Sequence, residues 1–423
     1  MDVDSGQHIQ LTATDGQQME VVSKAAPGQM DKVDTCLQAL ELAATDSEVF
    51  AALLLVAKVV QAENVGAETR QRIFDAVGFK FVNKLLKAAA KPDKKDAALY
   101  RGLAVTFLAC FSTSPELVAH PQMSGKIPVL IQVIHCGRAS LEDEQQQTID
   151  DAYQILITMA MRGSLRKNLI GQNVVSALCT IIQEKHYGFE KAERLLLILL
   201  HHCSQDVWRL NRPQMDLLLN KLASQFKDCQ DELKFEVCDK LSRLLSACSA
   251  VPVEQSEWSH SVFKGVSDIL MSKVVERYRD PALRLASLMV SHQGISWALG
   301  PGQREKKFLL LVVHLACVET RMALESPDKE YRASKETVLA SCFNLLEQSI
   351  EYLTCGPTLA LDDRQVVQLH TAMTGAFGAV MHFLQAAQFE ESWTDKPLVT
   401  AAVRVLCVWL AEETTALKEQ VYE

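Results

Sequence analysis

The stretch that decides the fold is "TDSEVFAALLLVAKVV" (residues 45–60), in which Lys58 is the only charged residue after Glu48. A helix over residues 49–60 rises only about 18 Å, whereas the apolar core of a bilayer requires about 20 residues. The stretch is therefore too short to span a membrane. Thr45 and Glu48 have the three-residue spacing of a capping box, which predicts that a helix begins here.

The apolar residues of this stretch cover more than one side of the predicted helix. One face holds Val49, Ala52, Leu53, Val56, Val59 and Val60, and a second stripe holds Phe50, Leu54 and Ala57. The segment "GFEKAERLLLILLHHC" (188–203) has the same double coverage, whereas "SLEDEQQQTIDDAYQILITMA" (140–160) has one apolar stripe opposite acids and glutamines. A helix that is apolar on two sides needs neighbours on both, so this alternation predicts stacked helical repeats.

The composition agrees with an all-α protein. Hydrophobic residues make up 48% of the 423 residues, but aromatic residues only 6%, and the chain has 18 glycines and 12 prolines. A sheet protein of this size needs more β-branched and aromatic residues and more turn glycines. The formal net charge of -9 argues against nucleic-acid binding, which is driven by lysine and arginine. We predict an all-α fold, an armadillo/HEAT-like α-solenoid.

A repeat register is visible in three segments, 108–134, 157–182 and 198–222. In each, an apolar helix end leads through a polar break with a short helix into a new apolar helix. Leu130, Leu178 and Leu218 hold comparable places, 48 and 40 residues apart, close to the period of armadillo and HEAT units. We predict one helical-repeat domain over residues 31–423. Residues 1–30 are acidic and polar without the features of a signal peptide, and are expected to be a disordered leader.

Capping residues, glycines and prolines mark the expected joints between helices. A capping residue precedes a proline at Ser114–Pro115, Asp280–Pro281 and Ser326–Pro327, and each pair predicts a helix start. Further joints are expected at Gly188, at Asn211–Arg212–Pro213 and at Asp395.

The cysteines and the short motifs indicate no catalytic, metal or cofactor site. Most of the 12 cysteines lie in apolar runs and none forms a C-x-x-C pair, which is typical of buried free thiols in the cytoplasm. His201, His202 and Cys203 are adjacent, so on a helix they point about 100° apart and do not converge on one ion. Asp150–Asp151 and Asp362–Asp363 are predicted to lie on solvated faces. An enzyme with a cysteine nucleophile such as Cys136 or Cys229 is the alternative.

The most strongly basic segment is "KFVNKLLKAAAKPDKKDAALYR" (80–101). Its basic strip consists of Lys80, Lys84, Lys87, Lys91, Lys94, Lys95 and Arg101. The first four lysines have helical spacing and share one face. The strip is either a docking site for an acidic protein partner or an anionic lipid surface, or an ordinary solvated face.

Several strings resemble the neurochondrin family: "TDSEVFAALLLVAKVV", "ETRQRIFDAVGFKFVNKLL", "LACFSTSPELVAHPQMSGKIP", "HYGFEKA", "LVVHLACVETRMALE" and "VRVLCVWLAEETTALKEQV". The resemblance runs collinearly from about residue 46 to 421. It implies an armadillo-like protein of the neuronal cytoplasm and dendrites, without a known active site or cofactor. It also implies roles in neurite outgrowth, synaptic plasticity, signalling from metabotropic glutamate receptors, and restraint of phosphorylation of the type II calcium/calmodulin-dependent kinase.

Two departures from the family pattern affect what the resemblance implies. Family members are considerably longer, so the helical domain is expected to be incomplete at its C-terminal end. The start "MDVDSG" has neither adjacent cysteines nor a glycine at position 2, so acyl anchoring is not expected. We expect an interaction protein that holds kinase and receptor tails, with peripheral membrane contact left open. A trafficking or nuclear-transport adaptor is the alternative.

Overall fold

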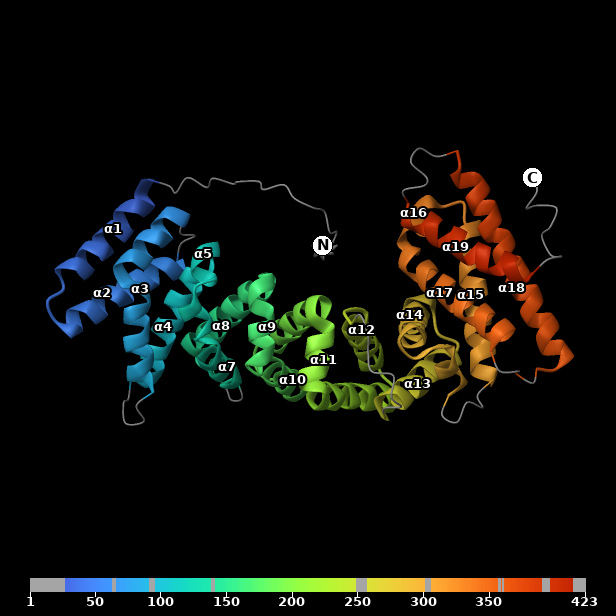
Figure 1. Cartoon of the computed structure of the whole chain (residues 1–423), viewed down its shortest axis with the longest axis horizontal. Helices are drawn as coiled ribbons and strands as arrows, with labels where there is room; N and C mark the ends of the chain where they lie inside the picture. The colour runs from blue at the N-terminus through green and yellow to red at the C-terminus, as the bar shows by residue number, and fades with distance from the viewer. Residues whose placement is uncertain are drawn as a thin grey trace, which may run out of the picture. The chain divides into compact units, whose positions relative to one another are not determined.

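The computed structural model describes residues 27–62, 66–90, 96–137, 141–248, 257–300, 306–356, 359, 361–389 and 396–413. These residues form nineteen α-helices and one 3₁₀-helix, with no strand among them, which confirms the all-α fold class. Within the described ranges, no helix is both long enough and apolar enough to cross a bilayer. The described residues divide into two compact units, one up to Leu117 and one from Val118 onward. Their helices are labelled in Figure 1.

The expected leader lies mostly outside the described residues, which begin at Pro27. Helix α1 starts at that residue, inside the range assigned to the leader. The division into a leader of residues 1–30 and a single repeat domain stays a prediction.

The first unit consists of two packed helix pairs. Its helices are α1 (Pro27–Leu42), α2 (Asp46–Ala62), α3 (Ala67–Ala89) and α4 (Ala97–Ser112). Helix α1 pairs with α2 and α3 with α4, and the pairs meet through α1 on α3 and α2 on α4. The capping box at the start of α2 is confirmed: Thr45 N–H donates to Glu48 Oε2 at 3.0 Å, and Glu48 N–H donates to Thr45 Oγ1 at 3.3 Å. Helix α2 therefore has neighbours on two sides, as its double apolar coverage predicts.

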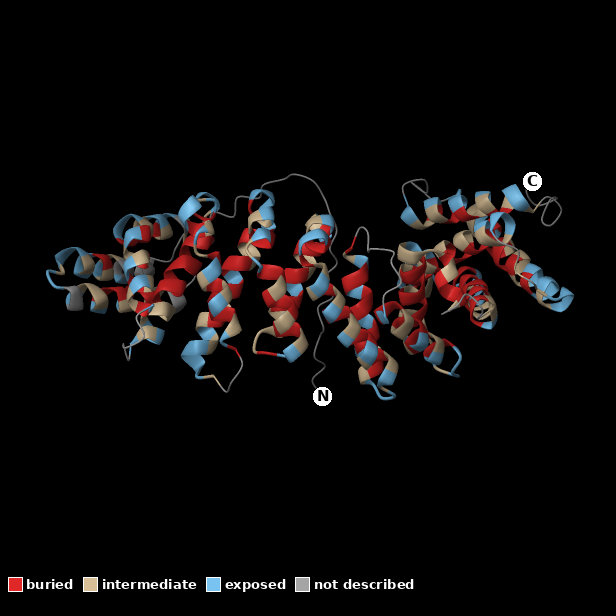
Figure 2. Cartoon of the chain, turned by 60° about the horizontal axis from the view of Figure 1, so that its bottom comes forward, coloured by how far each residue is buried: buried red, intermediate tan, exposed pale blue. Residues whose placement is uncertain are grey.

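The short helix α5 (Pro115–Val118) lies at the boundary of the units, and the second unit contains the remaining helices. They are α6 (Pro121–Ser124), α7 (Ile127–His135), α8 (Asp143–Met161), α9 (Gly163–Gly171), α10 (Val174–Glu184), α11 (Phe189–Asp228), α12 (Leu233–Ser246), α13 (Glu257–Leu270), α14 (Glu276–Gln293), the 3₁₀-helix η1 (Ile295–Leu299), α15 (Lys306–Glu325), α16 (Lys329–Ser334), α17 (Glu336–Cys355), α18 (Asp363–Ala387) and α19 (Pro397–Glu412). Figure 2 shows that buried residues line the sides on which these helices face one another.

Two rows of helices run through the second unit. The first row consists of α8, the start of α11, α12, α14, α17 and α19, and the second of α7, α10, the end of α11, α13, α15 and α18. The first four helices of the first row begin at Asp143, Phe189, Leu233 and Glu276, which are 46, 44 and 43 residues apart. This period, with packing only between near neighbours, is that of an α-solenoid. Leu130, Leu178 and Leu218 all lie fully buried in the second row, which confirms the predicted register.

Helix α11 shows how the sequence sets the joints of a repeat. Its 40 residues contain non-helical backbone at Cys203 and Asn211, so they form three helical segments. The predicted joint before Pro213 is thus confirmed. The helix begins after Gly188, whose φ of 78° is left-handed, and a Cβ there would lie 2.6 Å from Cε2 of the buried Tyr153. Glycine is required at this joint for both reasons.

One predicted helix start is wrong. Helix α14 begins at Glu276, and Pro281 lies inside it rather than in its first turn. A proline this close to a helix start removes only one backbone hydrogen bond, and the buried face of α14 outweighs that loss. The joint at Ser326–Pro327 is real, but the capping residue is Asp328, whose Oδ1 accepts from Glu330 N–H at 2.9 Å. Asp395 lies outside the described residues.

The prediction of a solvated face for Asp150–Asp151 is also wrong. Asp151 is only 7% exposed and accepts from Gln147 Nε2 at 2.9 Å. Asp150 pairs with Lys191 of α11 at 2.6 Å. The reason is that α8 packs against α7, α9 and α11 and is buried over more than the single stripe its sequence indicates. Asp362, by contrast, caps α18 in an exposed capping box with Gln365.

Candidate functional site

The structure describes four residues of the predicted basic strip. Lys80, Lys84 and Lys87 are exposed on the segment of α3 that follows its kink at Gly78, and Arg101 is half-buried on α4. Lys91, Lys94 and Lys95 lie outside the described residues. Three of the lysines therefore share an exposed helix, as predicted. A role of the strip in binding stays a prediction.

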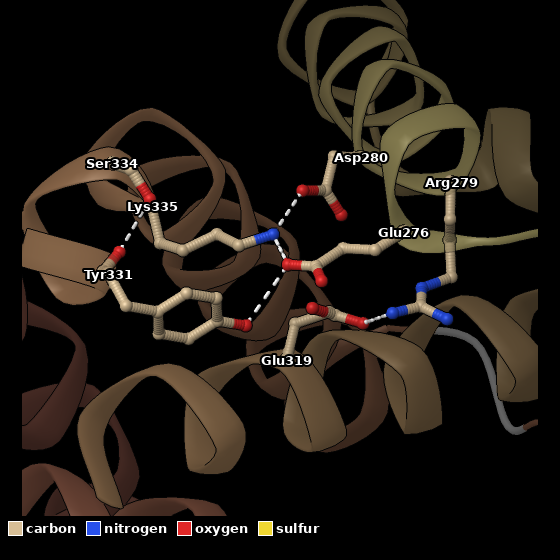
Figure 3. Close-up of polar contacts among 7 residues, drawn as sticks. All are labelled: Glu276, Arg279, Asp280, Glu319, Tyr331, Ser334 and Lys335. Carbon is tan, nitrogen blue, oxygen red and sulfur yellow. Dashed lines mark hydrogen bonds and ion pairs between the residues drawn. The ribbon is translucent and has the colours of Figure 1, made fainter. Parts of the chain in front are cut away.

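A group of charged side chains that was not predicted from the sequence lies in the second unit, where α14, α15 and the start of α17 meet. Three carboxylates, those of Glu276, Asp280 and Glu319, come within 4.8 Å of one another (Figure 3). We call these three residues the carboxylate cluster. Glu276 and Asp280 lie one turn apart on α14, and Glu319 projects from α15. Glu319 is only 2% exposed, so its charge is held almost entirely away from water.

Two cations compensate the carboxylate cluster. Lys335, the residue before α17, places its ammonium between Glu276, with which it forms an ion pair, and Asp280 Oδ2, which lies 2.5 Å away (Figure 3). Arg279 of α14 forms an ion pair with Glu319. Buried charges are retained only where partners and hydrogen bonds replace water. The cluster therefore joins α14 both to α15 and to α17 by charge.

A tyrosine and a helix turn complete the arrangement. Tyr331 of α16 donates its hydroxyl hydrogen to Glu276 Oε1 at 3.0 Å, and Ser334 Oγ donates to the carbonyl oxygen of Tyr331 at 2.6 Å. The hydrogen bond from Tyr331 to Glu276 joins the short helix α16 to α14, as Figure 3 shows. Burial, together with the carboxylates of Glu319 and Asp280, raises the pKa of the Tyr331 hydroxyl, so it stays protonated and remains a donor.

Within the described residues, the cluster has three carboxylates but only two paired cations, Lys335 and Arg279. The pKa of one carboxyl group, that of Asp280, is raised. Burial and the neighbouring Glu319 carboxylate raise the pKa of Asp280 to about 6, against the opposing influence of Arg279 and Arg284. Burial lowers the pKa of Lys335. Asp280 Oδ1 is buried without a hydrogen-bond partner, which also disfavours a full negative charge there. The cluster can therefore take up a proton in mildly acidic solution.

Three converging carboxylates are also the donor set that Ca²⁺ or Mg²⁺ prefers. Here the space between Glu276 and Asp280 holds the ammonium of Lys335, and Arg279 pairs with Glu319. These cations already supply the positive charge that a metal would bring. The arrangement fits a charged joint between helices better than a metal centre.

Within the described residues, the histidines and cysteines that the sequence offered as chemical alternatives belong to no group of three metal-ligating side chains. The rings of His201 and His202 lie edge to face at 4.9 Å, and both residues are exposed. Cys136 is exposed and its thiol donates to the carbonyl oxygen of Gln132 at 3.2 Å, while Cys229 is half-buried at the end of α11.

A sequence signal for the carboxylate cluster did exist. Glu319 lies in the apolar run "LVVHLACVETRMALE", between Ala316 and Ala323, which are buried on the same face of α15. A charge on a buried face requires a partner. The sequence does not identify that partner, since Arg279 is 40 residues away.

Comparison with known proteins identifies relatives along the whole helical part of the chain. A family model described as Neurochondrin matches residues 27–423. The neurochondrin of Homo sapiens is 39% identical over 396 residues, which cover 94% of this chain and 53% of that protein. The neurochondrin of Gallus gallus is 37% identical over 390 residues (92% and 55%), and the neurochondrin homolog of Drosophila melanogaster is 30% identical over 402 residues (93% and 55%). The chain spans about half the length of the curated relatives it matches.

Proposed function

Because the chain belongs to the neurochondrin family, we propose that it acts as a non-enzymatic interaction protein in neuronal signalling. In this proposal it binds the type II calcium/calmodulin-dependent kinase and restrains its phosphorylation. It also binds the cytoplasmic tails of metabotropic glutamate receptors, and so promotes neurite outgrowth and synaptic plasticity. Its site of action is the cytoplasm of the neuronal cell body and dendrites.

The observation that carries the proposal is the two-row stack of the second unit. Each helix of a row packs mainly on its near neighbours, so a long series of helix faces stays available to other proteins. Such faces hold extended segments or helices of a partner without any catalytic group. Regulation by occupancy requires only that the bound segment is withdrawn from a kinase.

The basic strip is the proposed docking element of the first unit. Lys80, Lys84 and Lys87 are exposed and follow one another at intervals of four and three residues on α3, so their ammonium groups lie along one side. An acidic segment of a partner gains several attractions there at once. Because exposed charges are screened by salt, this binding weakens as ionic strength rises.

Phosphorylation of the purified kinase tests the proposal. The chain is added to the kinase with calcium and calmodulin, and phosphate incorporation is measured against chain concentration. We expect incorporation to fall with added chain, and to fall less with the variant K80E/K84E/K87E.

The matched control is K58E/K264E/K273E, which reverses the same number of exposed lysines outside the strip. We expect it to behave like the wild type. The proposal is wrong if the folded wild-type chain neither changes phosphate incorporation nor co-precipitates with the kinase or the receptor tails. Equal losses in the variant and the control argue against the strip alone.

A further inference from the structure

Ion pairs connect the consecutive helices of the first row at nearly every junction that the structure describes. Asp150 of α8 pairs with Lys191 of α11 at 2.6 Å. At the next junction the buried Glu193 of α11 pairs with two residues of α12, Lys240 at 3.1 Å and Arg243 at 3.0 Å. Further along, Lys335 joins α14 to α17 through the carboxylate cluster, and Glu347 of α17 pairs with Arg404 of α19 at 2.6 Å.

The junction between α12 and α14 is different. Here the rings of Phe235 and Tyr278 stack with their centroids 4.0 Å apart and their planes at 23°. The far end of the same junction is joined by His292 Nε2 and the carbonyl oxygen of Leu245, 3.0 Å apart. Among the described residues, no ion pair links these two helices.

A hollow lies beside the aromatic stack. Its volume is about 320 Å³, and it is lined by Glu232, Phe235, Glu236, Asp239, Arg277 and Tyr278. This volume is at the lower end of the range for ligand sites in proteins and accommodates a single large side chain. We call these six residues the α12–α14 groove.

The charges of the groove favour a cation. Glu232, the residue before α12, has helical backbone and lies four residues from Glu236, which is three residues from Asp239, so the three side chains share one side of this helix. Asp239 pairs with Arg243 of its own helix at 3.0 Å, whereas Glu232 and Glu236 form no ion pair within the described part of the chain. Both of these glutamates are exposed. Two carboxylates one turn apart, on the wall of a hollow, can accept hydrogen bonds from one positive group at the same time.

The opposite wall favours a flat cation in particular. The guanidinium of Arg277 already lies over the Tyr278 ring, 5.1 Å from its centroid. This contact shows that the Tyr278 ring binds a guanidinium. Arginine fits both walls because its planar fork can bind a carboxylate through two hydrogen bonds and stack on an aromatic ring at the same time.

We propose that the α12–α14 groove binds an arginine side chain of a protein partner, with Glu232 and Glu236 holding the guanidinium against the Phe235–Tyr278 stack. The inference does not depend on the kinase or receptor partners proposed above. It adds a second interaction surface of opposite charge to the basic strip. Arg277 competes for the same ring and is displaced or shifted when the partner's arginine enters.

The test is fluorescence anisotropy of the full chain with a short fluorescein-labelled peptide of alternating arginine and alanine. We expect E232Q/E236Q to weaken binding about tenfold, since two charge-assisted contacts are lost. The control D143N/E144Q removes two exposed carboxylates from the first turn of α8 and should leave the dissociation constant within about a factor of two, through long-range attraction only. Circular dichroism establishes that each variant is folded.

A second variant and its control test for tighter rather than weaker peptide binding. Because Arg277 occupies the ring and repels a cation, R277Q should tighten peptide binding. R364Q, which removes an exposed arginine of α18, should change the dissociation constant far less. The inference is overturned if the wild type does not bind the peptide, if E232Q/E236Q binds as tightly as wild type, or if D143N/E144Q loses as much. A lysine peptide that binds as well as the arginine peptide would overturn the role of the aromatic stack.

Discussion

The α14–α17 junction and the α12–α14 junction lie next to each other in one row of helices, yet they are built in opposite ways. At the first, the buried Lys335 places its ammonium between the half-buried carboxylates of Glu276 and Asp280. At the second, an aromatic stack holds the helices, and Glu232 and Glu236 are exposed beside a hollow. The two junctions therefore use charged side chains differently. Charges that are compensated internally join the stack, and charges left exposed remain available to a partner.

The largest effect on stability is expected at the α14–α17 junction. The substitution Lys335→Met removes the buried ammonium and leaves the half-buried carboxylates of Glu276 and Asp280 without it. Breaking a fully buried pair costs about 3–5 kcal/mol, and because these carboxylates are partly exposed we expect a smaller loss of about 2–3 kcal/mol of unfolding free energy. Urea unfolding followed by circular dichroism measures it, with the exposed Lys264→Met as control. A loss of the same small size in both variants would show that the cluster does not join the helices.

A substitution in the aromatic stack should have an intermediate effect. Phe235→Leu keeps an apolar side chain against α14 but removes the stacked ring, which contributes about 0.5–1.5 kcal/mol beyond burial. The same urea experiment measures the loss. We expect this variant also to bind the arginine peptide more weakly. If Phe235→Leu costs as much as Lys335→Met, the two junctions do not differ in the proposed way.

The stability of the α14–α17 junction should also depend on pH. The pKa of Asp280 is raised from its ordinary value of 3.8 to about 6, so the folded chain binds more protons than the unfolded chain between these values. This group therefore favours folding below about pH 4, and that contribution is lost as the pH rises through 6. Asp280→Asn removes the dependence, so the melting temperature of the variant relative to wild type should rise across this window.

The exposed Asp143→Asn is the reference for this measurement, because any general effect of removing a carboxylate appears in it as well. A relative melting temperature of Asp280→Asn that stays constant from pH 4 to pH 7 would contradict the assignment of the raised pKa.

The smallest effect is expected for the groove carboxylates. E232Q/E236Q changes exposed side chains that form no ion pair among the described residues, so its unfolding free energy should stay within about 0.5 kcal/mol of wild type. Binding of the arginine peptide should nevertheless fall. A large loss of stability would show that these glutamates hold the helices together and are not available to a partner.

The sequence was sufficient to predict the helices and their joints wherever the deciding contacts are local. Thr45 with Glu48, Gly188, and Asn211 with Pro213 all act within a few residues, and each was found where predicted. The period was predictable because Leu130, Leu178 and Leu218 face the core in successive repeats.

What the sequence missed depends on contacts between distant helices. The position of Asp280 before Pro281 is typical of a helix start, but Asp280 pairs with Lys335, 55 residues away. Asp150 was predicted to be solvated because its partner Lys191 lies in the next repeat. The stacking of Phe235 on Tyr278 is equally non-local, so neither junction could be located from a local pattern.

The glycine that opens α11 limits how the family can diverge. Residue 188 combines a left-handed backbone with the edge of Tyr153, which would lie 2.6 Å from any added Cβ. Even alanine would have to displace a buried ring, and the left-handed backbone adds a further cost for a residue with a Cβ. We therefore expect evolution to have kept this position as glycine in every member whose repeats retain the tyrosine, so that alignment of distant homologues can be anchored there.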